Sequence, residues 1–236
     1  MSNRKIPIVD SEYYHIYNRG NSKQKIFLDK EDYEYFIKCL YCCNTYKNFI
    51  FRENIIKQNI DAFDFEREET IVSIGAWVLM PNHFHIYIIT GHKSDLWQSI
   101  KRNENKNRIS EFMRKISTAY AKYFNAKYNR TGGLFEGKFK SIYIKNDNQA
   151  KYLFSYIHLN PVKLIDSKWK EEGIKNIQKS LDFLSKYKWS SYLDYRDKTR
   201  INYKILDLNN FPKYFSNIKD FDKEIITWLK YKDKES

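Results

Sequence analysis

The chain has 236 residues, of which 42% are hydrophobic and 17% aromatic, enough for one large domain or a domain with an appendage. Its net charge of +13 favours a polyanionic partner, although the abundance of Lys, Asn and Ile is also what AT-rich coding DNA would produce. Apolar runs are too short to cross a membrane. The three cysteines, Cys39, Cys42 and Cys43, share one apolar stretch, which excludes a disulfide framework and a four-cysteine zinc site. We therefore expect a cytoplasmic protein with no membrane partner.

Secondary structure is predicted from aromatic enrichment and alternation for strands, and from capping residues and apolar stripes for helices. In chain order we expect a strand at 11–18 and then a helix at 29–41 that is capped by Asp29. Two strands follow at 71–80 and 84–90, around a turn at Pro81-Asn82, and then a long helix at 109–124 and a strand at 139–145. The next helix, capped by Asn146 or Asp147, must end near Asn160 because Pro161 follows.

The resulting order, β-α-β-β-α-β, is that of a ferredoxin-like α+β fold, an antiparallel sheet with helices on one face. This topology makes 84–90 a central strand. We divide the chain into a domain at 8–165 and a C-terminal helical appendage at 166–236, which is either part of the same globule or loosely attached.

Positive charge is concentrated between Lys101 and Lys145. Twelve basic and three acidic residues leave +9 of the chain's +13 in this segment. Tyr and Phe residues are interspersed with the charges and can stack on unpaired bases. The pattern favours single-stranded nucleic acid, although solvated helix faces would give part of it.

His83 and His85 lie two residues apart in an apolar run that continues as a strand. Side chains at this spacing point to the same face of a sheet, so both imidazoles are available to one divalent metal. A lone His-x-His pair is more often packing or surface than a ligand set. Two histidines also leave a metal site incomplete, and a third ligand is expected.

Tyr156 and Asn160 are one helical turn apart in the segment 152–160, so a phenol and an amide share one face of the helix. A tyrosine can attack phosphorus and form a phosphotyrosine. The Asn160 amide oxygen suits Mg²⁺ or Mn²⁺ as a further ligand. Tyr152 is the rival nucleophile, and its alternative role is core packing.

Several motifs, taken together and in this order, are similar to one family. Met80-Pro-Asn-His-Phe-His85 resembles the HUH motif (His, bulky hydrophobic, His) of single-strand DNA transposases with one catalytic tyrosine. The segment 156–163 resembles the tyrosine helix of the REP-associated branch and its insertion-sequence relatives. Further landmarks bring the resemblance to roughly residues 10–195: Tyr17–Asn21, Gly133–Phe135, Lys138–Lys140, Trp189–Tyr192.

The resemblance implies a DNA endonuclease and strand transferase that nicks and rejoins single-stranded or hairpin DNA. His83 and His85 would bind the metal, with Asn160 where the family places a Gln or Asn near it. Tyr156 would be the nucleophile that takes the 5′ phosphate. We expect His15 to be a packed or surface residue and His158 to be structural or DNA-facing. Basic candidates for phosphate contacts are Arg19, Arg130, Lys138 and Lys140.

Two alternatives stay open at this point. A domesticated DNA-binding protein that acts on palindromic repeats without transposing would fit the charge equally well. A structural metal site in an unrelated basic protein is the other. DNA is the expected partner of both the transposase and the domesticated DNA-binding protein. The sequence does not choose between a monomer and a homodimer.

Overall fold

The computed structural model describes residues 8–90 and 107–231, whose centre is a four-stranded antiparallel sheet. The strand order is β2-β3-β1-β4, with bounds as follows: β1 (Tyr13–Arg19), β2 (Ser73–Met80), β3 (His83–Ile89), β4 (Lys140–Tyr143). The predicted ferredoxin-like topology is confirmed, and β3, which carries the histidine pair, is a central strand.

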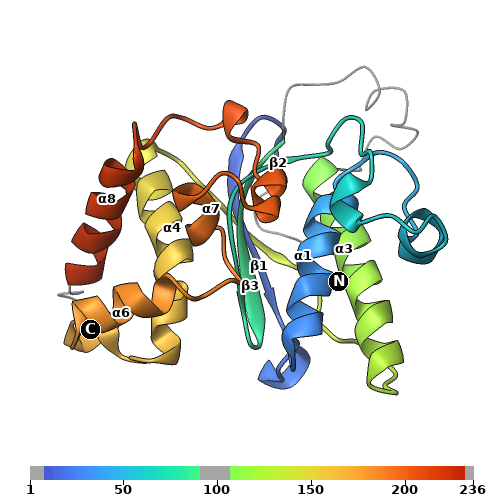
Figure 1. The fold of residues 1–236 in the computed structure, drawn as a ribbon, viewed down its shortest axis with the longest axis horizontal. Helices are drawn as coiled ribbons and strands as arrows, with labels where there is room; N and C mark the ends of the chain where they lie inside the picture. The colour runs from blue at the N-terminus through green and yellow to red at the C-terminus, as the bar shows by residue number, and fades with distance from the viewer. Residues whose placement is uncertain (1–7, 91–106, 232–236) are drawn as a thin grey trace.

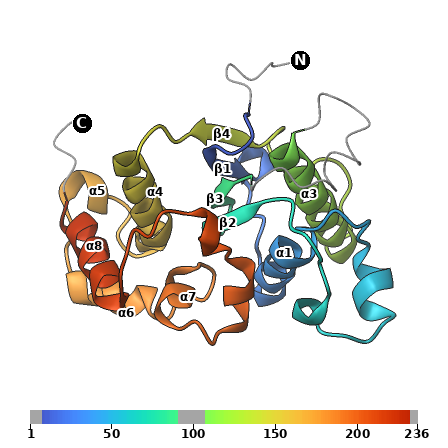
Figure 2. The ribbon, with the colours of Figure 1, turned by 90° about the horizontal axis from the view of Figure 1, so that it is seen from above.

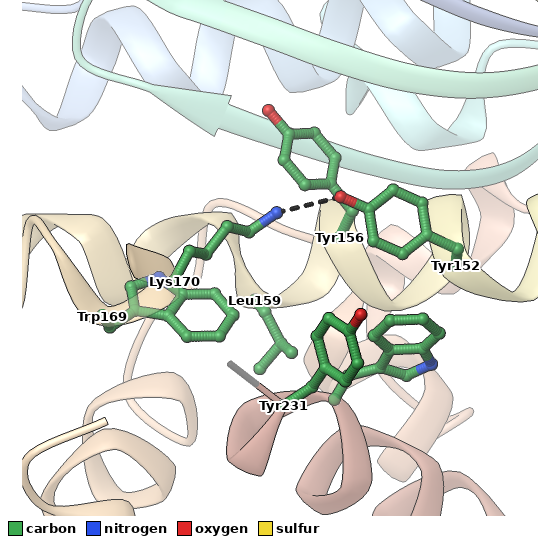
Figure 3. Close-up of a pocket in the computed structure, with 7 residues that line it drawn as sticks. Tyr152, Tyr156, Leu159, Trp169, Lys170 and Tyr231 are labelled. Carbon is green, nitrogen blue, oxygen red and sulfur yellow. Dashed lines mark hydrogen bonds between the residues drawn. The ribbon is translucent and has the colours of Figure 1, made fainter. Parts of the chain in front are cut away.

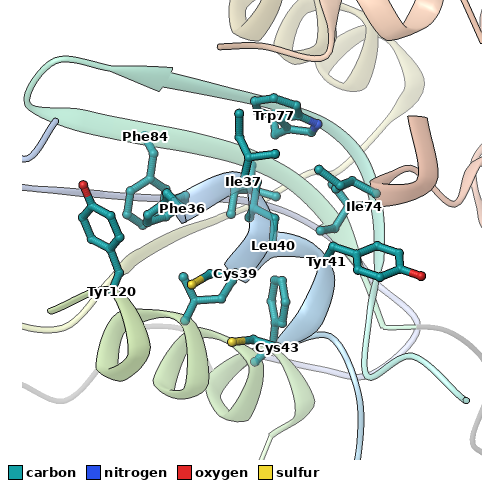
Figure 4. Packing of buried hydrophobic residues seen from close by; sticks show 14 of the residues in the cluster. Phe36, Ile37, Cys39, Leu40, Tyr41, Cys43, Ile74, Trp77, Phe84 and Tyr120 are labelled. Atoms are coloured by element: carbon teal, nitrogen blue, oxygen red, sulfur yellow. The ribbon is translucent and has the colours of Figure 1, made fainter. Parts of the chain in front are cut away.

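Helices α1 (Lys30–Cys42) and α3 (Arg108–Lys127) cover one face of this sheet (Figure 1). Asp29 caps α1 as predicted, and its carboxylate accepts from the Asp32 backbone in a capping box. Figure 4 shows the apolar stripe of α1 packed against the sheet and α3. The three cysteines belong to this core and are free and buried.

Helix α4 (Asp147–Leu159) lies against the opposite face, as Figures 1 and 2 show. The Asn146 side chain caps it by accepting from the Gln149 backbone. The α-helix ends at Leu159 as predicted from Pro161, but the chain continues as a 3-10 helix, η4 (Asn160–Leu164). Proline fits there because it occupies the first turn, where its missing N–H is not needed.

The remaining elements are short connecting turns and the helices of the C-terminal part. One π-helical turn and several 3-10 turns connect the layers: η1 (Asn21–Lys23), η2 (Arg52–Ile56, π), η3 (Ala62–Asp64), η5 (Ile201–Ile205), η6 (Leu208–Asn210). The C-terminal part adds helices beside α4: α5 (Trp169–Glu172), α6 (Ile177–Leu184), α7 (Tyr192–Arg196), α8 (Ile218–Lys230).

This C-terminal part shares a hydrophobic core with α4 and the sheet. Apolar side chains of β2 and β3 and those of α4 form one buried cluster with Trp169, Phe221 and Ile225. The segment 189–191 also runs along β2, since the Leu79 N–H donates to the Trp189 carbonyl at 2.8 Å. Among the described residues, no helix is long and apolar enough to cross a membrane.

Candidate active site

The two-residue alternation of the strands separates the sheet into two faces. Phe84 and Ile86 of β3 enter the core beneath α1 and α3, so His83 and His85 face α4. The register extends this row of polar side chains to the neighbouring strand: His83 is paired with Arg19, and His85 is paired with Tyr17. Tyr17 is in turn paired with Lys140 on the edge strand β4.

The two imidazoles are close neighbours with different partners. Their ring centroids are 5.0 Å apart. The Nδ1 atom of His83 lies 2.7 Å from the Oδ1 atom of Asn82, and the Nδ1 atom of His85 lies 2.8 Å from the Nε2 atom of His15 on β1. Each histidine therefore uses Nδ1 within the protein, so Nε2 is the ring nitrogen that a metal would bind.

Helix α4 brings Tyr156 to these histidines. The Tyr156 ring lies 5.4 Å from the His85 ring and 6.1 Å from the His15 ring, in edge-on geometry in both cases. His158, on another face of α4, is fully buried, and its Nε2 atom lies 2.8 Å from the Ser191 hydroxyl. It is structural and not DNA-facing, and through it the helix is fixed to the segment beside β2.

Tyr152, the rival nucleophile, points elsewhere. Its ring lies 4.9 Å from Trp228 of α8, and its phenol oxygen accepts a hydrogen bond of 3.1 Å from Lys170. Figure 3 shows Tyr152 in a pocket lined by α4, α5 and α8, while the Tyr156 hydroxyl points out of it toward the sheet. The orientation favours Tyr156 as the group that reaches the histidines.

Asn160 is buried, with 2% of its surface exposed, one turn after Tyr156. It lies close enough to His83 and Tyr156 to affect the pKa of both, yet neither amide atom makes a hydrogen bond of normal geometry. A buried amide oxygen next to the His83 imidazole fits a Mg²⁺ or Mn²⁺ site. Within 8–90 and 107–231 there is no group of three or more His, Cys, Asp or Glu that could hold a metal, so the amide would have to complete the protein ligands.

Burial sets the protonation of the site. It lowers the pKa of His83 to about 4, which Asn160 partly offsets, and it lowers the pKa of His85 well below its ordinary value. Both imidazoles are therefore neutral at pH 7, the form that binds a metal. Burial also raises the pKa of the Tyr156 phenol, against a smaller opposing effect of Asn160.

The basic candidates divide between the two faces of the sheet. Arg19 lies beside His83 and pairs with Glu136, to which its Nη2 atom donates at 3.0 Å. Lys140 shares the row of His85, and both Lys140 and Lys138 are exposed. The Arg130 guanidinium instead lies over the Phe124 ring of α3, on the other face. Of the twelve basic residues between Lys101 and Lys145, three lie outside the described residues: Lys101, Arg102, Lys106.

Sequence reasoning missed three residues around the site. His15 is buried as expected for a packed residue, but its bond to His85 was not foreseen, although the alternation of β1 places it on the same face. Lys163 of η4 and Lys170 of α5 are near enough for their charges to lower the pKa of His85. Lys170 also lies 4.3 Å from the centroid of the Tyr156 ring.

The chain matches no family model and no curated protein. Among solved structures it is similar to a REP-associated tyrosine transposase bound to a REP hairpin, with a TM-score of 0.48 and 15% identity over 92% of this chain and 100% of that chain. A putative transposase from Deinococcus radiodurans R1 gives a TM-score of 0.31 and 11% identity over 65% of this chain and 93% of that chain. The tRNA(His) guanylyltransferase of Saccharomyces cerevisiae gives a TM-score of 0.33 and 14% identity over 90% of this chain and 86% of that chain.

Proposed function

We propose that this protein is a transposase-like endonuclease and strand transferase that cuts and rejoins single-stranded or hairpin DNA through a 5′-phosphotyrosine. The observation that carries the proposal is the position of Tyr156, whose ring lies 5.4 Å from that of His85. A phenol beside a pair of neutral, metal-competent imidazoles is the combination that phosphoryl transfer to tyrosine requires.

In the forward step the Tyr156 oxygen attacks the scissile phosphorus and loses its proton to solvent. The bond from phosphorus to the 3′ oxygen breaks, and that oxygen takes up a proton to become a free 3′ hydroxyl. One phosphoester replaces another, so the bond energy is conserved. Attack by a 3′ hydroxyl on the phosphotyrosine reverses the step and rejoins a strand.

His83, His85 and Asn160 would hold a divalent ion, Mg²⁺ or Mn²⁺. When bound, such an ion would polarise a phosphoryl oxygen and orient the phosphate. The chain's own contribution is to keep both imidazoles neutral by burial and to hold the buried Asn160 amide next to His83. Imidazole ligands tilt the preference toward Mn²⁺.

The surface beside the site suits a nucleic-acid backbone. Lys140 and Lys138 are exposed at the edge strand, and Lys163 and Lys170 lie on the side of α4. Contacts from such residues position a strand without reading its sequence. Unpaired bases can stack on aromatic side chains such as Tyr17, which is half-buried between His85 and Lys140.

The test is covalent trapping on a fluorescent single-stranded hairpin with Mn²⁺. The parent is expected to form an adduct that survives denaturing electrophoresis. Tyr156→Phe should bind the same DNA but form no adduct, because only the nucleophilic oxygen is lost. Tyr152→Phe is the matched control, one turn away, and should keep adduct formation; EDTA should abolish the adduct of the parent.

Adducts from Tyr156→Phe at the level of the parent would contradict the assignment of the nucleophile. A parent that binds the hairpin tightly but never forms an adduct would instead favour the domesticated DNA-binding protein. Adducts that persist in EDTA would contradict the metal requirement while leaving Tyr156 in place.

A further inference from the structure

His15 and His85 form a buried pair across two neighbouring strands. His15 is 7% exposed and His85 is 6% exposed, and 2.8 Å separates the Nε2 atom of His15 from the Nδ1 atom of His85. Because His15 is paired with Tyr87 and His85 with Tyr17, the two histidines are diagonal neighbours on the same face. The backbone register therefore fixes the contact, not a flexible loop.

The direction of this hydrogen bond follows from the chemistry of the ring. A neutral imidazole carries one N–H donor and one acceptor nitrogen. If His85 offers the Nε2 lone pair to a metal, its proton is on Nδ1, and His85 donates to the Nε2 atom of His15. His15 then carries its own proton on Nδ1.

His83 provides an independent case of the same arrangement. Its Nδ1 atom lies 2.7 Å from the Oδ1 atom of Asn82, which can only accept, so His83 donates from Nδ1. Both His83 and His85 thus have a hydrogen-bond partner within the protein at Nδ1. A partner of this kind fixes the tautomer and the ring orientation of a metal-binding histidine.

We propose that His15 is a positioning residue that holds His85 in the Nδ1–H tautomer, with Nε2 free to bind a divalent metal, as Asn82 does for His83. The proposal rests on the proposed function insofar as it needs a metal at His83 and His85. It adds a residue on β1 to a site otherwise built from β3, α4 and η4, and it predicts metal affinity that depends on a side chain outside the ligand set.

The first experiment reads the tautomer in the metal-free protein. Long-range ¹H–¹⁵N NMR of the histidine rings is expected to show His85 protonated on Nδ1 in the parent. In His15→Phe, which keeps an aromatic ring but removes the acceptor, His85 should change to the Nε2–H tautomer that free neutral imidazole favours. His15→Gln, whose amide oxygen can accept, should keep the Nδ1–H tautomer.

The second experiment measures Mn²⁺ affinity by calorimetry without DNA. His15→Phe is expected to weaken binding about 10- to 100-fold, and His15→Gln to recover most of it. Tyr13→Phe is the matched control: Tyr13 is two residues away on the same face, and its hydroxyl donates to the Asn210 carbonyl instead of touching the histidines. Thermal unfolding of the metal-free variants checks that lost affinity does not reflect lost folding.

Three results would overturn the proposal. The parent and His15→Phe could show the same His85 tautomer and the same Mn²⁺ affinity. Electron spin-echo spectra of bound Mn²⁺ could show one coordinated imidazole fewer in His15→Gln than in the parent, which would make His15 a ligand. A parent that binds no Mn²⁺ would overturn the proposed metal role along with this one, whereas a parent that binds Mn²⁺ as tightly as His15→Phe overturns this one alone.

Discussion

Tyr156 has to act as a nucleophile from a site that makes its phenol a weaker acid. Burial raises the pKa of Tyr156 above its ordinary value of about 10, and Asn160 opposes this only in part. Close to pH 7 the phenol is therefore almost entirely protonated before DNA and metal bind. This loss of nucleophile reactivity is offset if the same burial keeps water away from the phosphotyrosine.

The rate of adduct formation should consequently rise with pH, by up to about tenfold for each pH unit, with no plateau between about pH 7 and pH 10. Single-turnover trapping at saturating Mn²⁺ and hairpin measures this profile. Replacing Tyr156 with a fluorinated tyrosine, which is more acidic, should move the profile to lower pH. An unshifted profile would assign the titration to another group.

At the scale of the elements, the site exists because α4 is fixed to the sheet. His158 of α4 meets the Ser191 hydroxyl, and the same hydroxyl accepts from the Trp77 backbone N–H of β2 at 3.0 Å. Ser191 is fully buried, so these groups have no water to replace a lost partner. The orientation of Tyr156 thus depends on a segment that follows it by more than thirty residues.

Burial lowers the pKa of His158 to about 3, and this gives the anchor a pH dependence. In the unfolded chain His158 binds a proton below about pH 6.5, whereas the folded protein does not until about pH 3. The unfolded state binds more protons between these values, so His158 contributes stability above about pH 6.5 that is lost as pH falls.

Urea unfolding at a series of pH values between 7 and 4 should therefore show a shallower fall in unfolding free energy for His158→Phe than for the parent. One group can contribute at most about 1.4 kcal/mol for each pH unit. The other buried histidines are present in both proteins, so the difference isolates His158. Parallel curves would contradict the assignment.

The elements themselves were predictable because their signals are local. The alternation in β3 and the caps Asp29 and Asn146 each need only a few neighbouring residues, and the structure bears them out. The contact between His15 and His85 joins residues 70 apart and depends on register, which no local pattern fixes. The docking of α4 over the histidines likewise depends on tertiary packing.

At the scale of the whole molecule, the C-terminal part completes the core on which α4 rests. Its sequence is mostly polar, which is why it was expected only as an appendage. Its few apolar residues are nevertheless concentrated on faces toward α4, as in α8, where Phe221, Ile225 and Leu229 recur every four residues and are buried. These residues join the cluster that includes Val78 of β2 and Tyr87 of β3.

Because that core is shared, Ile225→Ala should destabilise the whole chain and not a separate unit. Ile225 is fully buried, and truncation at such a position costs about 2–5 kcal/mol. Ile218→Ala is the matched control in the same helix, since 47% of Ile218 is exposed, and should change stability by less than about 0.5 kcal/mol. Urea unfolding followed by far-ultraviolet circular dichroism and by tryptophan fluorescence should give coincident, single transitions in all three proteins. Two transitions, of which Ile225→Ala shifts only one, would mean that residues 166–236 unfold independently. The position of Tyr156 would then have to be explained without residues 166–236.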